Sequence, residues 1–172
     1  RFTMKIYRDC FGGGAGFDNP AEMAIYRGTY DNNILLSPMA IRTQSQGGAY
    51  LHNLVAGAVH MWPEPNRFTP YFLPHSTDVS ALTTILSGDD RFCNNIFIGR
   101  GEKAIKDKRP VSGLAVYDNA KLPVWISDNL YLNGAQPSSS DKTMLTDARF
   151  DPRPDFEEID GSLYLHLNIN EL

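Results

Sequence analysis

The sequence predicts an all-β chain that folds as a right-handed parallel β-helix, a solenoid of stacked coils, and three observations support this. A short motif recurs in which Asn precedes a three-residue apolar strand and Gly or another turn residue follows the strand. Further short apolar strands then occupy the place where the next side of each coil should be. No long stretch shows a 3.6-residue apolar period, whereas 14 Gly and 11 Pro supply many turns.

The Asn of the recurring motif suits a corner of such a coil. Its four anchors are Asn33, Asn53, Asn95 and Asn129, separated by 20, 42 and 34 residues. Asn tolerates the left-handed backbone that sharp corners need, and its amide can bond to the Asn of the coil above or below. The alternative is that these Asn residues mark the turns of ordinary β-hairpins. The repeated order of Asn, strand, Gly and second strand argues against that alternative.

The second strands and the stretches between them define the organisation of the chain. We expect second strands at residues 23–26, 39–42, 58–61 and 113–117. The pattern is interrupted at residues 63–90, where we expect a long loop stiffened by prolines. A second interruption at residues 100–112 is expected to be a charged, solvated insertion. Residues 135–160 predict a linker that leads into a strand at 163–169. The prediction is therefore a β-helix domain over 1–134, followed at 135–172 by a linker and a strand of a flanking domain.

Composition narrows the classes of partner and compartment. The net charge of −4 argues against a nucleic-acid backbone as partner, and no apolar run approaches the 18 residues of a membrane span. Cys10 and Cys93 are interpreted as free thiols, which favours a reducing compartment and a cytoplasmic location. The four His residues are too scattered for a local metal site, and no cofactor motif is present.

The two ends of the sequence predict an internal fragment of a longer protein. The chain starts directly in a strand-like run at Arg1 and ends in an alternating strand over 163–169. A solenoid needs caps to hide its open edges, and neither end supplies one. The oligomeric state stays open, with a homo-oligomer among the options.

The long loop offers a candidate binding site, because insertions on one face of a solenoid commonly carry function. Aromatic rings beside a few polar groups suit a sugar, whose apolar face stacks while its hydroxyls form hydrogen bonds. The alternative is that the loop packs its aromatic side chains over the coils. The loop and its border contain Trp62, Arg67, Tyr71, His75 and Asp78, of which Arg67, Tyr71 and His75 are the candidate substrate contacts.

Five short motifs, in this order, carry a resemblance to a known family. The chain resembles the right-handed β-helix β-xylosidases of glycoside hydrolase family 120 over roughly residues 18–150. The resemblance implies a retaining glycosidase that acts on β-xylosides with an Asp nucleophile and a Glu acid/base. The motifs are DNNILLSP at 31–38, GGAYLHNLVAG at 47–57, PHST at 74–77, GDDRFCNNIFIG at 88–99 and LPVW at 122–125.

The resemblance places the acid/base on Glu22, nine residues before Asp31, and Asp18 also matches the family pattern. It places the nucleophile one coil upstream, before Arg1, so the 172 residues alone are predicted to be inactive. Successive coils of a β-helix lie about 4.8 Å apart, close to the 5–5.5 Å between carboxyl groups that retaining enzymes need. The polar stretch expected after the Glu is replaced here by residues 23–28. The alternative for Glu22 is therefore a solvated or ion-paired structural residue.

Three functional hypotheses remain. The first is a glycoside hydrolase in which Glu22 protonates the leaving oxygen and then activates water, with a carbohydrate substrate and no cofactor. The second is a non-catalytic carbohydrate-binding β-helix. The third is a polysaccharide lyase, which would use a Lys or Arg base and acidic ligands for calcium. Asp89 and Asp90 form the only local acidic cluster beside an Arg, and we interpret them as a turn.

Overall fold

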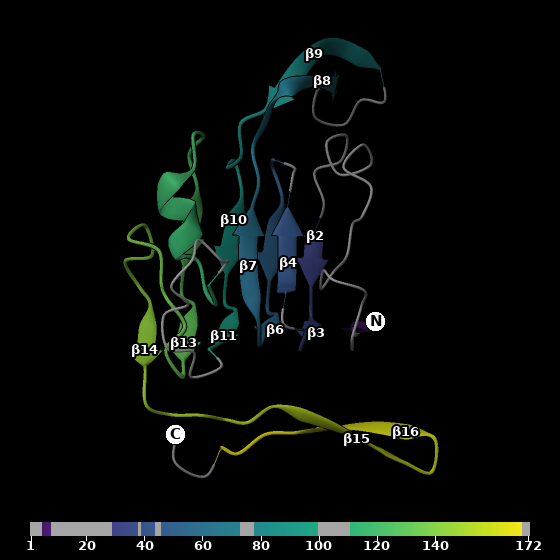
Figure 1. The fold of residues 1–172 in the computed structure, drawn as a ribbon, viewed down its shortest axis with the longest axis vertical. Helices are drawn as coiled ribbons and strands as arrows, with labels where there is room; N and C mark the ends of the chain where they lie inside the picture. Colours follow the sequence, from purple (N-terminus) through teal and green to yellow (C-terminus); the bar gives the residue numbers. More distant parts are fainter. Residues whose placement is uncertain are drawn as a thin grey trace.

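The computed structural model describes residues 5–7, 29–37, 39–43, 46–72, 78–99 and 111–169. These residues form an all-β structure with one 3₁₀ helix (Figure 1). The elements are β1 (Lys5–Tyr7), β2 (Thr29–Asp31), β3 (Asn33–Leu35), β4 (Met39–Thr43), β5 (Ala49–Leu51), β6 (Leu54–Val55), β7 (Ala58–Met61), β8 (Glu64–Phe72), β9 (Val79–Ile85), β10 (Arg91–Cys93), β11 (Ile96–Ile98), η1 (Ala115–Asn119), β12 (Trp125–Ser127), β13 (Leu130–Leu132), β14 (Leu145–Asp147), β15 (Asp155–Ile159) and β16 (Ser162–His166).

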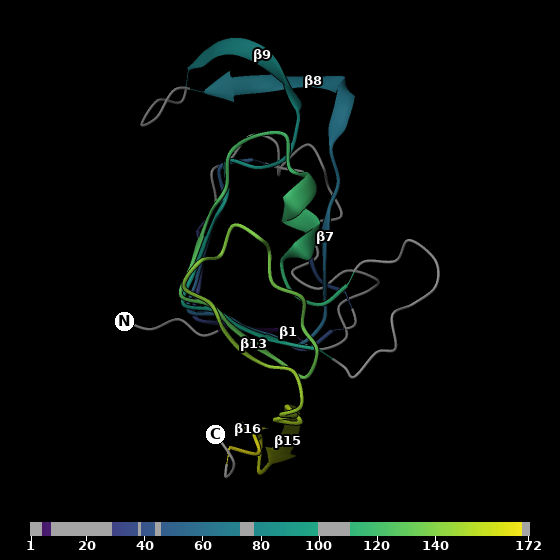
Figure 2. The same ribbon diagram turned by 90° about the vertical axis from the view of Figure 1, so that its left-hand side faces the viewer.

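Three parallel sheets form the body of the molecule. Their strand orders are β1-β3-β6-β11-β13-β14, β12-β10-β5-β2 and β4-β7, and every neighbouring pair is parallel. Two successive passes of the chain, β2-β3-β4 and β5-β6-β7, place one strand in each sheet, and the later passes β10-β11 and β12-β13 extend the two larger sheets. Figure 2 shows these passes superimposed. The parallel pairing is consistent with the predicted β-helix and excludes the hairpin interpretation of the Asn motif.

The four anchor Asn side chains form a buried ladder across the passes, which confirms the predicted stacking. Asn33 Nδ2 donates to Asn53 Oδ1 at 2.8 Å. Asn53 Nδ2 donates to Asn95 Oδ1 at 2.9 Å, and Asn95 Nδ2 donates to Asn129 Oδ1 at 2.9 Å. Each acceptor also takes the backbone N–H of the preceding Asn. Asp141 ends the ladder by accepting from Asn129 Nδ2 at 2.9 Å.

The left-handed backbone of each corner lies one residue before the ladder, not at the ladder Asn itself. Asn32, His52, Asn94 and Asp128 have φ angles of 55°, 52°, 56° and 57°. One residue therefore makes the turn, and the next points its amide inward to bond the neighbouring pass. Asn and Asp favour the left-handed region because their short polar side chains can bond locally.

Aromatic rings stack inside the coils at the spacing of the strands. The ring centroids of Tyr30 and Tyr50 are 4.8 Å apart, and those of Tyr50 and Phe92 are 4.4 Å apart. A second stack joins Phe97 and Tyr131 at 5.3 Å. Neighbouring strands lie about 4.8 Å apart, so in-register aromatic residues meet face to face.

The Gly that follows a strand has a steric reason. A Cβ added to Gly57 would lie 2.0 Å from the backbone oxygen of Ser37, and one added to Gly99 would lie 2.1 Å from that of Asn133. Neighbouring passes therefore approach too closely at these corners for any side chain.

Two predicted segments differ from the structure. Much of the predicted loop at 63–90 is the antiparallel hairpin of β8 and β9, which projects beyond the stacked passes in Figures 1 and 2. Prolines are tolerated in such a two-stranded hairpin because each strand has a free edge. The predicted strand at 113–117 is largely the helix η1. Its Tyr117 is buried and donates to Asp90 Oδ2 at 3.0 Å, so core packing replaces a strand there.

The C-terminal part contains more strand than predicted. β14 pairs with β13 and extends the main sheet beyond residue 134, and the expected last strand, β16, pairs with β15 in a hairpin. The division into 1–134 and 135–172 stays a prediction. Cys93 is a free thiol as expected, whereas Cys10 lies outside the described residues. Within the described ranges, no helix is long and apolar enough to cross a membrane.

Candidate functional site

The structure tests the predicted site residues only in part. Glu22 and His75 lie outside the described residues. Arg67 and Tyr71 lie on strand β8, so they belong to a hairpin and not to a loop, and the structure does not describe their side chains. Asp31, from which the resemblance places Glu22, ends β2, and its carboxylate forms a hydrogen bond with His52 Nδ1 at 3.1 Å.

Strands β4 and β7 place Arg42 and His60 side by side on the outside of the coils. The register pairs these two residues directly. Their strand neighbours Ile41, Thr43, Val59 and Met61 are all buried. Because side chains alternate between the two faces of a strand, Arg42 and His60 point outward.

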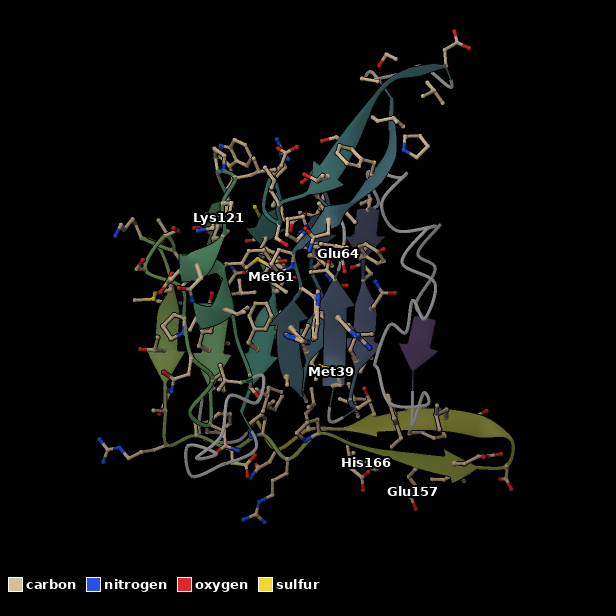
Figure 3. The ribbon with its side chains drawn as sticks, turned by 45° about the horizontal axis from the view of Figure 1, so that its top comes forward. Met39, Met61, Glu64, Lys121, Glu157 and His166 are labelled. Carbon is tan, nitrogen blue, oxygen red and sulfur yellow. The ribbon has the colours of Figure 1, made fainter. Side chains whose placement is uncertain are left out.

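Trp62 completes this surface, which we call the outer β4–β7 surface and define by Arg42, His60 and Trp62. Its backbone N–H donates to the oxygen of Thr43 at 2.9 Å, which continues the parallel pairing beyond β7. The side chain is 44% exposed. In Figure 3, Met39 lies at the start of β4, and Met61 and Glu64 lie where β7 leads into the β8–β9 hairpin.

Arg42 and His60 both lie against Trp62 on the outer β4–β7 surface. The guanidinium carbon of Arg42 lies 5.7 Å from the centroid of the Trp62 ring. The His60 and Trp62 rings meet edge to face, with centroids 5.2 Å apart and planes at 77°. Partial burial and the nearby charge of Arg42 lower the pKa of His60, so the imidazole is neutral near pH 7. The surface thus presents one cation, one neutral donor and acceptor, and one large ring.

Among the carboxyl groups of the described residues, that of Asp90, inside the coils, has the most strongly shifted pKa. Burial raises the pKa of Asp90 to about 6, although its hydrogen bonds from Gly48 N–H at 2.7 Å and from the Tyr117 hydroxyl act against the shift. Asp90 is 0% exposed, so no substrate or cation reaches it. The cluster interpreted as a turn therefore has two roles. Asp89 makes the turn with φ of 55°, and Asp90 joins two passes to η1.

A second exposed Trp differs from Trp62 in its surroundings. The Arg91 guanidinium lies 4.2 Å from the ring centroid of Trp125, which is 48% exposed. The same guanidinium donates to the Asp89 backbone oxygen at 2.8 Å and lies 3.4 Å from its carboxylate. Its cation is therefore already engaged by a neighbouring acid.

Sequence reasoning identified Trp62 but missed Arg42 and His60. Both residues lie in segments predicted as second strands. Stacking those strands in parallel would have placed the two polar residues next to each other. Among the described residues, no group of three His, Cys, Asp or Glu side chains is arranged to hold a metal ion.

The fold and this surface define an all-β chain of stacked parallel sheets with an aromatic, cationic patch outside one sheet. A solved structure of XylC in complex with xylose is similar to this chain, with a TM-score of 0.70 and 36% sequence identity. The match covers 81% of this chain and 25% of the XylC chain, so the chain spans about a quarter of its relative. No family model matches the chain, and the search of curated proteins gave no match.

Proposed function

We propose that this chain is part of a retaining glycoside hydrolase of the β-xylosidase type, built on a right-handed parallel β-helix. The observation that carries the proposal is the similarity to XylC, which was solved with xylose and shares 36% identity over 81% of this chain. The stacked parallel sheets support it further, because they set the spacing that a retaining carboxyl pair requires. The proposed substrates are β-xylosides derived from plant polysaccharides.

In the proposed mechanism, Glu22 is the acid/base. It would protonate the glycosidic oxygen as the bond breaks and then take a proton from the water that attacks the glycosyl-enzyme. The proposed nucleophile is an Asp one coil before Glu22, outside these 172 residues. The chain alone is therefore expected to show no hydrolysis.

The test is hydrolysis of an aryl β-xyloside by a protein that includes the preceding coil. Glu22→Gln should lower kcat by at least about 100-fold, because general acid/base catalysis contributes a factor of about 10² to 10⁴. Glu158→Gln, at an exposed position of β15, is the matched control and should retain most of the activity. Full activity of Glu22→Gln, or hydrolysis by the 172 residues alone, would contradict the proposal.

A second candidate is a non-catalytic carbohydrate-binding β-helix. The outer β4–β7 surface favours it, because Arg42, His60 and Trp62 offer ring stacking and hydrogen bonding without a carboxyl pair. Sugar binding that persists in a preceding-coil protein unable to hydrolyse any aryl β-glycoside would favour this candidate over the enzyme.

A further inference from the structure

We propose that the outer β4–β7 surface binds a sugar residue that carries a carboxylate, such as a uronic acid on a xylose-based chain. The inference rests on the proposed function and adds the chemical class of one contacted residue.

Arg42 is an exposed cation that no acid neutralises within the described part of the chain. The close contacts there between a basic side chain and a carboxylate involve His52, Arg91 and His166, and none involves Arg42. Arg91 is the informative comparison, since it also lies over a Trp but has Asp89 beside it. The guanidinium of Arg42 therefore keeps its planar fork of donors available, and that fork matches a carboxylate in two parallel hydrogen bonds.

Trp62 and His60 supply the other contacts that a sugar ring needs. Trp62 is 44% exposed with the Arg42 guanidinium carbon 5.7 Å from its ring centroid, so part of the indole is open to a ligand. The apolar face of a sugar can pack on the remaining indole. The neutral imidazole of His60 can donate to one hydroxyl or accept from another. A carboxylate at the rim of such a sugar would lie beside the guanidinium.

The three side chains are also held in place before a ligand arrives. Arg42 and His60 come from paired positions of two parallel strands, and the Trp62 backbone is bonded to Thr43. Side chains on strands hold a binding geometry more precisely than side chains on loops, because they lose less conformational freedom when a ligand binds. The net charge of −4 disfavours anions in general, so a preference for one would be a local property of Arg42.

The experiment compares two xylo-oligosaccharides of equal length, one neutral and one carrying a single glucuronic acid. Each is titrated into the protein at pH 7 by isothermal calorimetry. We expect the acidic sugar to bind about tenfold more tightly, and less so at high salt. Arg42→Gln should remove this preference while neutral binding remains, and Arg42→Lys should restore part of it. Arg91→Gln is the matched control and should leave the preference unchanged.

The binding titrations test the acidic-sugar preference, and the hydrolysis assay tests the proposed function, so the failure of one can be told from the failure of the other. Equal affinity for the two sugars, or a preference that survives Arg42→Gln, overturns the inference while sugar binding stands. Binding of neither sugar overturns both the inference and the assignment of this surface to carbohydrate. Hydrolysis of aryl β-xylosides is measured separately and reports on the proposed catalytic pair, not on the outer β4–β7 surface.

Discussion

The polar side chains inside the coils and those on the outer β4–β7 surface form two contrasting regions. Asn53 and Asn95 are buried, and each bonds to the next pass and to a backbone carbonyl. Arg42 and Trp62 are exposed and contact mainly each other and His60. The side chains of Asn53 and Asn95 are thus fully hydrogen-bonded within the fold, whereas Arg42 and Trp62 keep donors and ring surface for a ligand. Mutations in the two regions should separate stability from binding.

The largest expected effect comes from removing the middle of the ladder. Asn95→Ala should lower the free energy of unfolding by about 3 kcal/mol or more, because it leaves several buried groups without partners at about 1–3 kcal/mol each. These groups include the Asn53 N–H and the Tyr50 carbonyl. Urea unfolding measures the change.

Asn33→Ala is the graded control for that prediction. Among the described residues, the Asn33 side chain donates only to Asn53 Oδ1, and its own oxygen accepts no hydrogen bond. The expected loss is about 1 kcal/mol. Equal losses at Asn33 and Asn95 would show that the ladder is not the source of the stability.

The next effect is a pH dependence of stability that originates at Asp90. Its pKa is about 6 in the folded protein against an ordinary value of 3.8, so between these values the folded state binds more protons than the unfolded state. Its contribution therefore favours folding most below about pH 4 and is lost as the pH rises to about 6. The difference amounts to up to about 3 kcal/mol.

Asp90→Asn isolates this contribution, because the amide does not titrate. The difference in unfolding free energy between the wild type and Asp90→Asn should change with pH in that window and level off above it. A difference that is constant from pH 3.5 to pH 7.5 would show that the Asp90 carboxyl does not have the raised pKa.

On the outer surface, we expect an effect on binding with little effect on stability. Trp62→Ala should weaken binding of a neutral xylo-oligosaccharide by about tenfold, or about 1.4 kcal/mol, because it removes the stacking surface. Trp125→Ala removes an equally exposed ring whose Arg is already engaged by Asp89, and it should leave the affinity unchanged. Nuclear magnetic resonance titration of the two variants would distinguish the two surfaces.

The smallest effect is expected at the second Arg and Trp pair. Arg91→Gln should cost only about 0.5 kcal/mol, since both the ion pair with Asp89 and the contact with Trp125 are exposed. Thermal unfolding should show a small downward shift. A loss of unfolding free energy above about 2 kcal/mol would show that Arg91 contributes substantially to the stability of the fold.

The sequence predicted the ladder because one residue type recurs at each corner and can make only a few kinds of contact when buried. It did not reveal the hairpin of β8 and β9, because Pro63, Pro65 and Pro70 suggest a loop. It also did not reveal η1, where the apolar residues 113–117 suit a strand, and burial of Tyr117 against Asp90 decides the local structure. A contact that repeats along the chain leaves a recurring sequence pattern, whereas a single long-range contact leaves none.

The candidate site was predicted less completely for the same reason. The aromatic character of Trp62 was visible in the sequence, but its partners depend on the register between β4 and β7. That register sets Arg42 against His60, and no local pattern states it. Glu22 was inferred from the resemblance alone, and no geometry of the described residues tests it.

The assignment of the outer β4–β7 surface to sugar is tested most directly by titrating a neutral xylo-oligosaccharide into the wild type and Trp62→Ala, with unfolding measured on the same samples. We predict saturable binding by the wild type and about tenfold weaker binding by Trp62→Ala, with unfolding free energies that agree within about 0.5 kcal/mol. Equal binding by both proteins, or a loss of binding that follows a loss of stability, would contradict the assignment of the outer β4–β7 surface to sugar.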